Sequence, residues 1–165
     1  MCTSRLTTGI HGSSQTGAGR AAVRDISEQV RQRTRVFSTG NASEVSQDVQ
    51  VQQVIGKASA QVYAAEATTL RAAGASQRAY QSRFDLDAEK EHTANLLAEL
   101  ESAQAQVVVA DLTLRATSDL FNALGASATS TSKALDRHWR NARTAASHNP
   151  LIDPSPSSHS SMNLF

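Results

Sequence analysis

The longest periodic stretch of the chain, residues 87–123, limits the possible folds more than any other feature. Small or apolar side chains recur along it at steps of three and four residues, which is the spacing of one helical face. At ~1.5 Å per residue, such a helix is on the order of 55 Å long. A helix of this length needs long antiparallel partners to cover its apolar face, so the stretch predicts a helical bundle. The predicted face comprises Leu97, Leu100, Ala103, Val107, Ala110, Leu114, Thr117 and Phe121.

The first helix is predicted over residues 17–38. We expect it to stop at residues 38–41, where Gly40 can take a left-handed backbone conformation. Residues 1–16 are rich in Ser, Thr and Gly and have no apolar period, so we expect them to be disordered or to be a truncated helix start. The apolar stripe of this helix consists of Val23, Ile26, Val30 and Phe37.

The second helix is predicted to begin near Ser46 or Asp48, because either side chain can cap the free amides of a first helical turn. It should end before Asp85-Leu86-Asp87, a sequence suited to a turn and to capping the next helix. Its apolar positions again recur at three- and four-residue steps. They are Val51, Ile55, Ala58, Val62, Ala65, Thr69, Leu70, Ala73, Tyr80 and Phe84.

The fourth helix is predicted over residues 133–147, after Gly125 has ended the third and residues 126–132 have formed a linker. Thr131 or Ser132 would cap it. All three prolines lie beyond His148, among serines, so we expect residues 150–165 to be disordered. The sequence therefore predicts an all-α protein: an antiparallel up-and-down four-helix bundle over residues 17–149, with disordered ends.

Composition excludes several functional classes. The net charge is +1 with both signs interspersed, so we expect neither nucleic acid nor a membrane surface as a partner. No apolar run approaches the ~20 residues that cross a bilayer. The single cysteine, Cys2, cannot form a disulfide within one chain, and the N-terminus lacks the apolar region of a secretion signal. We therefore expect an intracellular, cytoplasmic protein.

The chemistry of the chain is concentrated in residues 135–150, LDRHWRNARTAASHNP. This segment holds the only Trp and three of the 16 Lys and Arg residues. One interpretation is a solvated amphipathic helix with an Asp136–Arg140 ion pair and a Trp139–Arg143 stack. The other is a surface that binds an anion or faces a flavin, because guanidinium groups present planar, forked donors to phosphate or to an electron-rich ring edge.

His148 also has two interpretations. A histidine at a helix C-terminus can simply oppose the helix dipole, or it can donate or accept a proton in a site. The other histidines form no set of ligands, and no Cys or acidic residue is spaced to complete one. We therefore predict no metal site.

The motif at 135–150, with its lead-in at 121–126, resembles the C-terminal signature of the acyl-CoA dehydrogenase superfamily. The likeness is to its monooxygenase branch, which includes dibenzothiophene monooxygenase and related sulfur-acquisition oxidoreductases. Residues 24–31 and 63–66 are similar to the first and second bundle helices of that family. The resemblance implies that the bundle is the C-terminal domain of a flavin-dependent oxidoreductase.

The resemblance also implies a cofactor, an assembly and roles for individual residues. The cofactor would be FMN in this branch and FAD in the true dehydrogenases, supplied by a separate flavin reductase, and the bundles would assemble into a homotetramer. His148 would be catalytic, assisting formation or protonation of the oxygen adduct of the flavin. The cofactor-binding candidates at motif positions are Arg137, Arg140, Asn141, Arg143 and Asn149.

The sequence departs from the family pattern in several ways, and one is Ser127, which stands where dibenzothiophene monooxygenase has Arg. Asn149 replaces the aspartate of many members, and residues 153–158, DPSPSS, stand where members continue with an ordered aromatic- and lysine-containing segment. The domains that normally precede the bundle are missing, so we expect a fragment with little activity of its own. The alternatives are a non-catalytic bundle that self-associates or joins a full-length relative, and an unrelated helical adaptor that does not depend on residues 135–149.

Overall fold

The structure is a computed structural model that describes residues 2–36 and 40–148, with side chains described from Gly12 onward. None of these residues lies in a strand, so the predicted all-α class is confirmed. The predictions for Phe37, Asn149 and residues 150–165 fall outside the described residues. The long helices are α1 (Cys2–Gln32), α2 (Val49–Gln81), α3 (Ala88–Asp119) and α4 (Arg137–His148). The short 3-10 helices are η1 (Val45–Gln47), η2 (Ser82–Phe84), η3 (Leu120–Ala123) and η4 (Gly125–Thr129).

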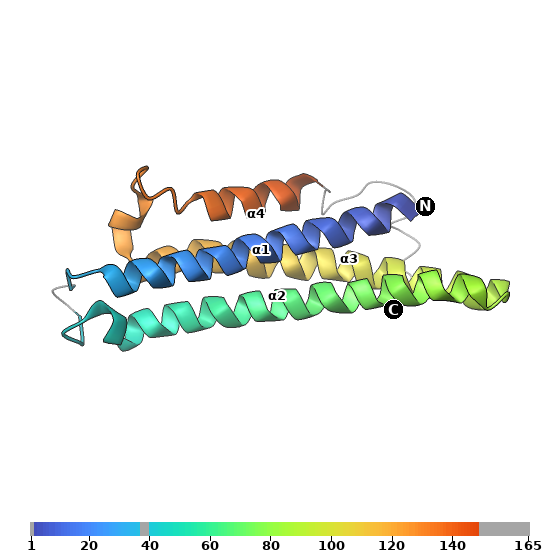
Figure 1. Ribbon diagram of the computed structural model, residues 1–165, viewed down its shortest axis with the longest axis horizontal. Coiled ribbons are helices and arrows are strands. Elements are labelled where there is room, and N and C mark those ends of the chain that lie inside the picture. Colours follow the sequence, from blue (N-terminus) through green and yellow to red (C-terminus); the bar gives the residue numbers. More distant parts are fainter. Residues whose placement is uncertain (1, 37–39, 149–165) are drawn as a thin grey trace.

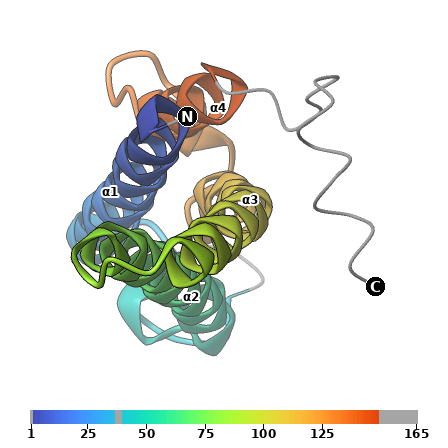
Figure 2. The ribbon, with the colours of Figure 1, turned by 90° about the vertical axis from the view of Figure 1, so that its right-hand side faces the viewer.

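The four long helices form an up-and-down antiparallel bundle. α1 and α3 run in one direction, and α2 and α4 run in the other (Figure 1). α4 packs on α1 and α3, on the side of the bundle away from α2. The turn between α2 and α3 projects beyond both α1 and α4, so this end of the molecule consists of two helices only (Figures 1 and 2). The predicted four-helix topology is therefore confirmed.

The core changes in character along the bundle. At the end where α1, α2 and η3 meet, it contains large buried side chains, including Ile26, Leu120 and Leu124. Towards the projecting turn, α2 and α3 meet through a cluster of alanines alone: Ala75, Ala79 and Ala98, with Ala94 at its edge. Alanine side chains let two helix backbones approach closely, but each removes little apolar surface from water.

The predicted apolar seams of α2 and α3 are partly wrong. On α3, Leu97 and Val107 are each 54% exposed, whereas small residues are buried in their place. On α2, Leu70 and Tyr80 are likewise exposed, and so is Phe84 in η2. Both sets of positions have helical spacing, and close packing of α2 on α3 selects the set with the smaller side chains. The buried set on α3 is Ala98, Ser102, Ala105, Val109, Ala110, Thr113, Ala116 and Thr117.

Several predicted helix ends also differ from the structure. α1 begins at Cys2 rather than Gly17 and ends at Gln32, well before Gly40. The polar residues Gln15 and Thr16 are buried, so this part of the helix packs without an apolar pattern in the sequence. α4 begins at Arg137 rather than at residue 133, because residues 130–136 form turns.

Other predicted ends are confirmed. The side chain of Asp48 caps α2 by accepting from the amide of Gln50 at 2.8 Å. Asp87 caps α3 by accepting from the amides of Glu89 and Lys90, each at 3.1 Å. Gly125 follows the end of α3 and η3 with φ of 67°, a left-handed conformation that glycine adopts without strain.

Two glycines of α1 should respond in opposite ways to alanine. A Cβ at Gly19 would lie 2.9 Å from Cγ2 of Val62, a stiff side chain of α2, whereas a Cβ at Gly17 would meet nothing within 4 Å. We expect Gly19→Ala to lower the free energy of unfolding by about 1–3 kcal/mol through overpacking. Gly17→Ala should raise it by about 0.5–1 kcal/mol. Urea unfolding of both variants checks this, and equal effects would contradict the observed α1–α2 packing.

Candidate functional site

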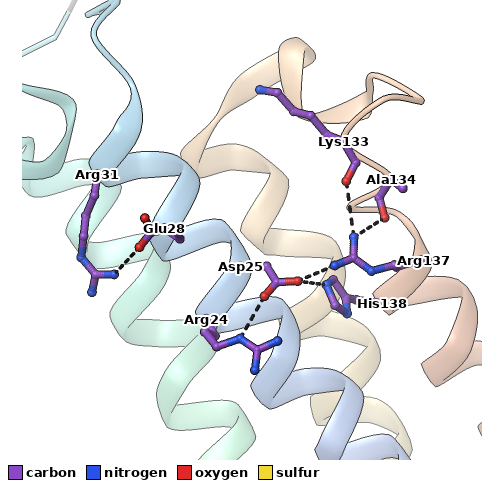
Figure 3. Close-up of polar contacts among 8 residues, drawn as sticks. All are labelled: Arg24, Asp25, Glu28, Arg31, Lys133, Ala134, Arg137 and His138. Carbon is purple, nitrogen blue, oxygen red and sulfur yellow. Dashed lines mark hydrogen bonds and ion pairs between the residues drawn. The ribbon is translucent and has the colours of Figure 1, made fainter.

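The N-terminal end of α4 is attached to α1 through one carboxylate, that of Asp25 (Figure 3). Two consecutive residues of α4 reach the same oxygen: Arg137 donates from Nη2 to Oδ2 at 2.5 Å, and His138 Nε2 lies 3.0 Å from Oδ2. The other oxygen, Oδ1, accepts from Nε of Arg24 at 3.0 Å. Asp25 therefore joins α1 to the start of the motif.

Arg137 also holds the turn that precedes α4. Its Nη1 donates to the carbonyl oxygens of Ala134 at 2.8 Å and Lys133 at 3.3 Å (Figure 3). Ala134 has a positive φ of 46°, which is uncommon for a residue with a side chain. The guanidinium thus links α1, the turn and α4. The cofactor-binding role of Arg137 stays a prediction.

His138 is held in the interior, with only 5% of its surface exposed. An ionised carboxylate can only accept, so Nε2 of the imidazole must carry the shared hydrogen. Burial lowers the pKa of His138 below its ordinary 6.5, and the charges of Arg137 and Arg24 act in the same direction. The hydrogen bond and charge of Asp25 oppose this without reversing it, so a neutral imidazole is favoured.

The carboxyl of Asp25 is shifted towards its charged form. Burial alone would raise its pKa, but the hydrogen bonds from Arg24 and His138 and the positive charge of Arg24 outweigh burial and hold the pKa below the ordinary 3.8. The side chain is 19% exposed, and the cluster is thus partly screened by water.

The outward side of α4 carries most of the other predicted site residues. Arg140, Asn141, Arg143 and His148 are all exposed, whereas the opposite side buries Ala142 and Ala146. Nε of Arg140 lies 3.1 Å from Oδ2 of Asp136, which confirms the predicted ion pair. Within the part of the chain that the structure describes, the side chains of Asn141 and Arg143 make no hydrogen bond or ion pair.

The structure therefore divides the predicted site residues into separate groups. Four share the exposed side of α4, Arg137 is engaged at its anchored end, and Asn149 lies outside the described residues. Asp25 was not among the residues that the sequence predicted for the site. The available signal was its position beside Ile26, one step from the buried stripe.

A hollow lies elsewhere, between α2 and α3 near the projecting turn. Its volume is about 520 Å³, and no residue of α4 lines it. The exposed residues of α4 therefore take no part in this hollow. The lining residues are Ala75, Arg78, Asp87, Glu89, Lys90, Thr93, Ala94, Leu97, Ala98 and Glu101.

No group of three or more His, Cys, Asp or Glu side chains in residues 12–36 and 40–148 could hold a metal ion. Within the described ranges, none of the helices has the length and apolar character that crossing a membrane requires.

Residues 9–151 match the family model described as acyl-CoA dehydrogenase, C-terminal domain. Because this match covers most of the chain, the chain belongs to that family. The four-helix bundle and the position of the motif on its last helix agree with the resemblance seen in the sequence. No curated protein matches the chain.

Among solved structures, the chain is similar to the C-terminal part of flavin monooxygenases. Methanesulfinate monooxygenase from Pseudomonas fluorescens is 28% identical, with a TM-score of 0.78, over 91% of this chain and 38% of that enzyme. The FMN-bound dibenzothiophene monooxygenase from Paenibacillus sp. A11-2 is 26% identical, with a TM-score of 0.73, over 89% and 36%. XiaF from Streptomyces sp., in complex with FADH2 and glycerol, is 25% identical, with a TM-score of 0.67, over 95% and 36%. The chain thus spans well under half the length of each of these proteins.

The protonation of His138 makes stability depend on pH. Its pKa is lower in the folded chain than the 6.5 of a free imidazole, so the unfolded chain binds the proton more readily. We expect the free energy of unfolding to be highest above pH 6.5 and to fall as the pH drops below it, until the lowered folded pKa is passed. Urea unfolding across this range measures the slope.

Two variants identify the source of that slope. His138→Gln should flatten it, whereas His92→Gln, at an exposed position of α3, should leave it unchanged. An unchanged slope in His138→Gln would contradict the burial of a neutral imidazole at this position.

Proposed function

We propose that the chain is the C-terminal helical domain of a flavin-dependent monooxygenase and that the outward side of α4 forms one wall of the flavin site. The observation that carries this proposal is that Arg140, Asn141, Arg143 and His148 are all exposed along a single helix. Membership of the family and likeness to an FMN-bound enzyme and an FADH2 complex support it.

The donor chemistry of this side fits a flavin nucleotide. Arg143 has an unengaged guanidinium, and the amide of Asn141 offers both a donor and an acceptor. Arg140 is paired only with the exposed carboxylate of Asp136, an interaction worth little in water and readily exchanged for a phosphate. Forked guanidinium donors suit a phosphate or the polar edge of the flavin ring.

The proposed roles follow from these groups. A bound reduced flavin would be the group that reacts with molecular oxygen. Arg140, Asn141 and Arg143 bind and orient the flavin, with Asn149 assigned here by family resemblance alone. His148, exposed at the C-terminal end of α4, holds or delivers a proton at a ring nitrogen beside the flavin. Activity of the complete enzyme requires further domains and a reductase that supplies reduced flavin, as the family resemblance implies.

Flavin binding by the purified chain tests the proposal. We expect saturable quenching of FMN or FAD fluorescence. Arg143→Ala should weaken it about tenfold or more, because one charge-assisted hydrogen bond contributes about 1.5–3 kcal/mol. His148→Ala should weaken it less. The control is Arg115→Ala, which removes an exposed arginine of α3 that pairs with Asp111. Equal affinity in all variants, or no binding by the wild-type chain, would refute a flavin wall on α4.

A second candidate function, assembly of identical subunits, is favoured by the exposed apolar side chains of α2 and α3. Large apolar groups gathered on one surface commonly mark a protein interface. We propose that these exposed side chains make the chain a homo-oligomer, whether or not the chain also binds flavin. They are Tyr63, Leu70, Leu96, Leu97, Val107 and Val108.

Light scattering after size exclusion tests the assembly. The wild-type chain should form a discrete oligomer, and Leu97→Gln combined with Val107→Gln should shift it towards the monomer, because two polar groups are then placed in an apolar interface. Gln104→Ala, at an exposed polar position of α3, is the control and should change nothing. A monomeric wild-type chain would rule out this interface.

A further inference from the structure

We infer that Asp25 is a positioning residue for the flavin-facing side of α4, and that the motif divides into an anchoring half and a presenting half. The anchoring half, Arg137 and His138, fixes the helix on α1. The presenting half contains Arg140, Asn141, Arg143 and His148. Only the role of the presenting half rests on the proposed function. The anchoring contacts are present in the chain whether or not it binds flavin.

The contacts of Asp25 fix the rotation of α4. Consecutive helical residues point about 100° apart, so a carboxylate that holds both Arg137 and His138 fixes the rotation of α4 as well as its distance from α1. A single contact would leave the helix free to turn about that point. Because the same guanidinium holds the carbonyls of Lys133 and Ala134, the entry of the chain into α4 is fixed by the same group.

The rest of the buried side of α4 carries only small side chains. Beyond His138, the buried residues of this helix are Ala142 and Ala146. Methyl groups fill space but have little shape, so they discriminate weakly between one register of a helix and the next. Hydrogen bonds to a partly buried carboxylate are directional and lose their partners when the helix turns or slides. The register of α4 therefore depends mainly on the Asp25 cluster.

α4 is too short to be stable by itself. It has 12 residues, a length at which an isolated helix has only marginal stability in water. His138 and His148 are about 15 Å apart along the axis, so a tilt of ~10° at the anchored end would move His148 by roughly 2.5 Å. Displacements of this size are large for groups that must meet a cofactor. Loss of the anchor should thus weaken binding without changing any side chain that touches the flavin.

Asp25→Asn tests this inference. Asparagine keeps the size of the side chain but removes its charge, so the bonds that Arg137 and His138 make to the one remaining acceptor oxygen lose their charge assistance, and the new NH₂ group faces the donor of Arg24. In the free protein, amide hydrogen exchange of α4 should accelerate about tenfold or more, while exchange in the α2–α3 core stays within about twofold. The pKa of His138, followed by NMR of its ring protons, should fall further, because Asp25 is the group that raises it.

Flavin binding gives the second readout, with FMN as the probe. Asp25→Asn should weaken FMN binding at least fivefold while accelerating α4 exchange. Arg143→Ala should weaken binding while leaving α4 exchange unchanged. Asp111→Asn, the same change at an exposed carboxylate of α3, is the matched control and should alter neither. If Asp25→Asn does not fold, Arg137→Lys replaces it, because lysine keeps the charge but lacks the fork that joins Asp25 to the turn.

The results separate the two proposals. Unchanged α4 exchange in the anchor variant, or equal acceleration across all helices, would overturn the anchoring role. Accelerated α4 exchange with undiminished FMN affinity would overturn the positioning role. Failure of the wild-type chain to bind FMN would refute the proposed function, and the exchange and NMR results would still decide whether Asp25 fixes α4.

Discussion

Close packing of α2 on α3 through small side chains is the constraint on which the rest of the molecule depends. Because alanine, serine and threonine occupy the contact, the two backbones approach closely and the larger apolar residues face outward. This arrangement gives the long hairpin that supports α1 and α4 and also creates the apolar surface proposed for assembly. Fold and interface thus share one cause, the placement of small residues at helical spacing.

The polar cluster around Asp25 complements that packing. Apolar contacts between alanines hold helices together without specifying their rotation, whereas Asp25, Arg137 and His138 make directional bonds between α1 and α4. A partly buried charged cluster of this kind adds little net stability once desolvation is counted. Its contribution is to select one arrangement of α4, and that arrangement decides which arginines face outward.

The helices of this fold could be predicted from the sequence more accurately than the sides on which they are buried. Side chains with an unambiguous local role, such as the caps Asp48 and Asp87, were identified correctly because their partners lie within one turn. The buried side of α3 was not, since Leu97 and Ala98 are neighbours on the same helix and both belong to series with helical spacing. Asp25 was missed because its partners lie 112 and 113 residues away in the sequence.

With the assembly proposed above, the projecting end of the α2–α3 hairpin would link folding to protein concentration. Its core is a cluster of alanines, and exposed ion pairs such as Arg78–Glu101 and Lys90–Asp87 contribute little in water. Neither α1 nor α4 covers it (Figure 1). Such a segment opens locally at low cost in a lone subunit and gains order only when another surface covers it. Dilution would therefore loosen this end of the bundle first, while the Ile26–Leu120 end remained closed.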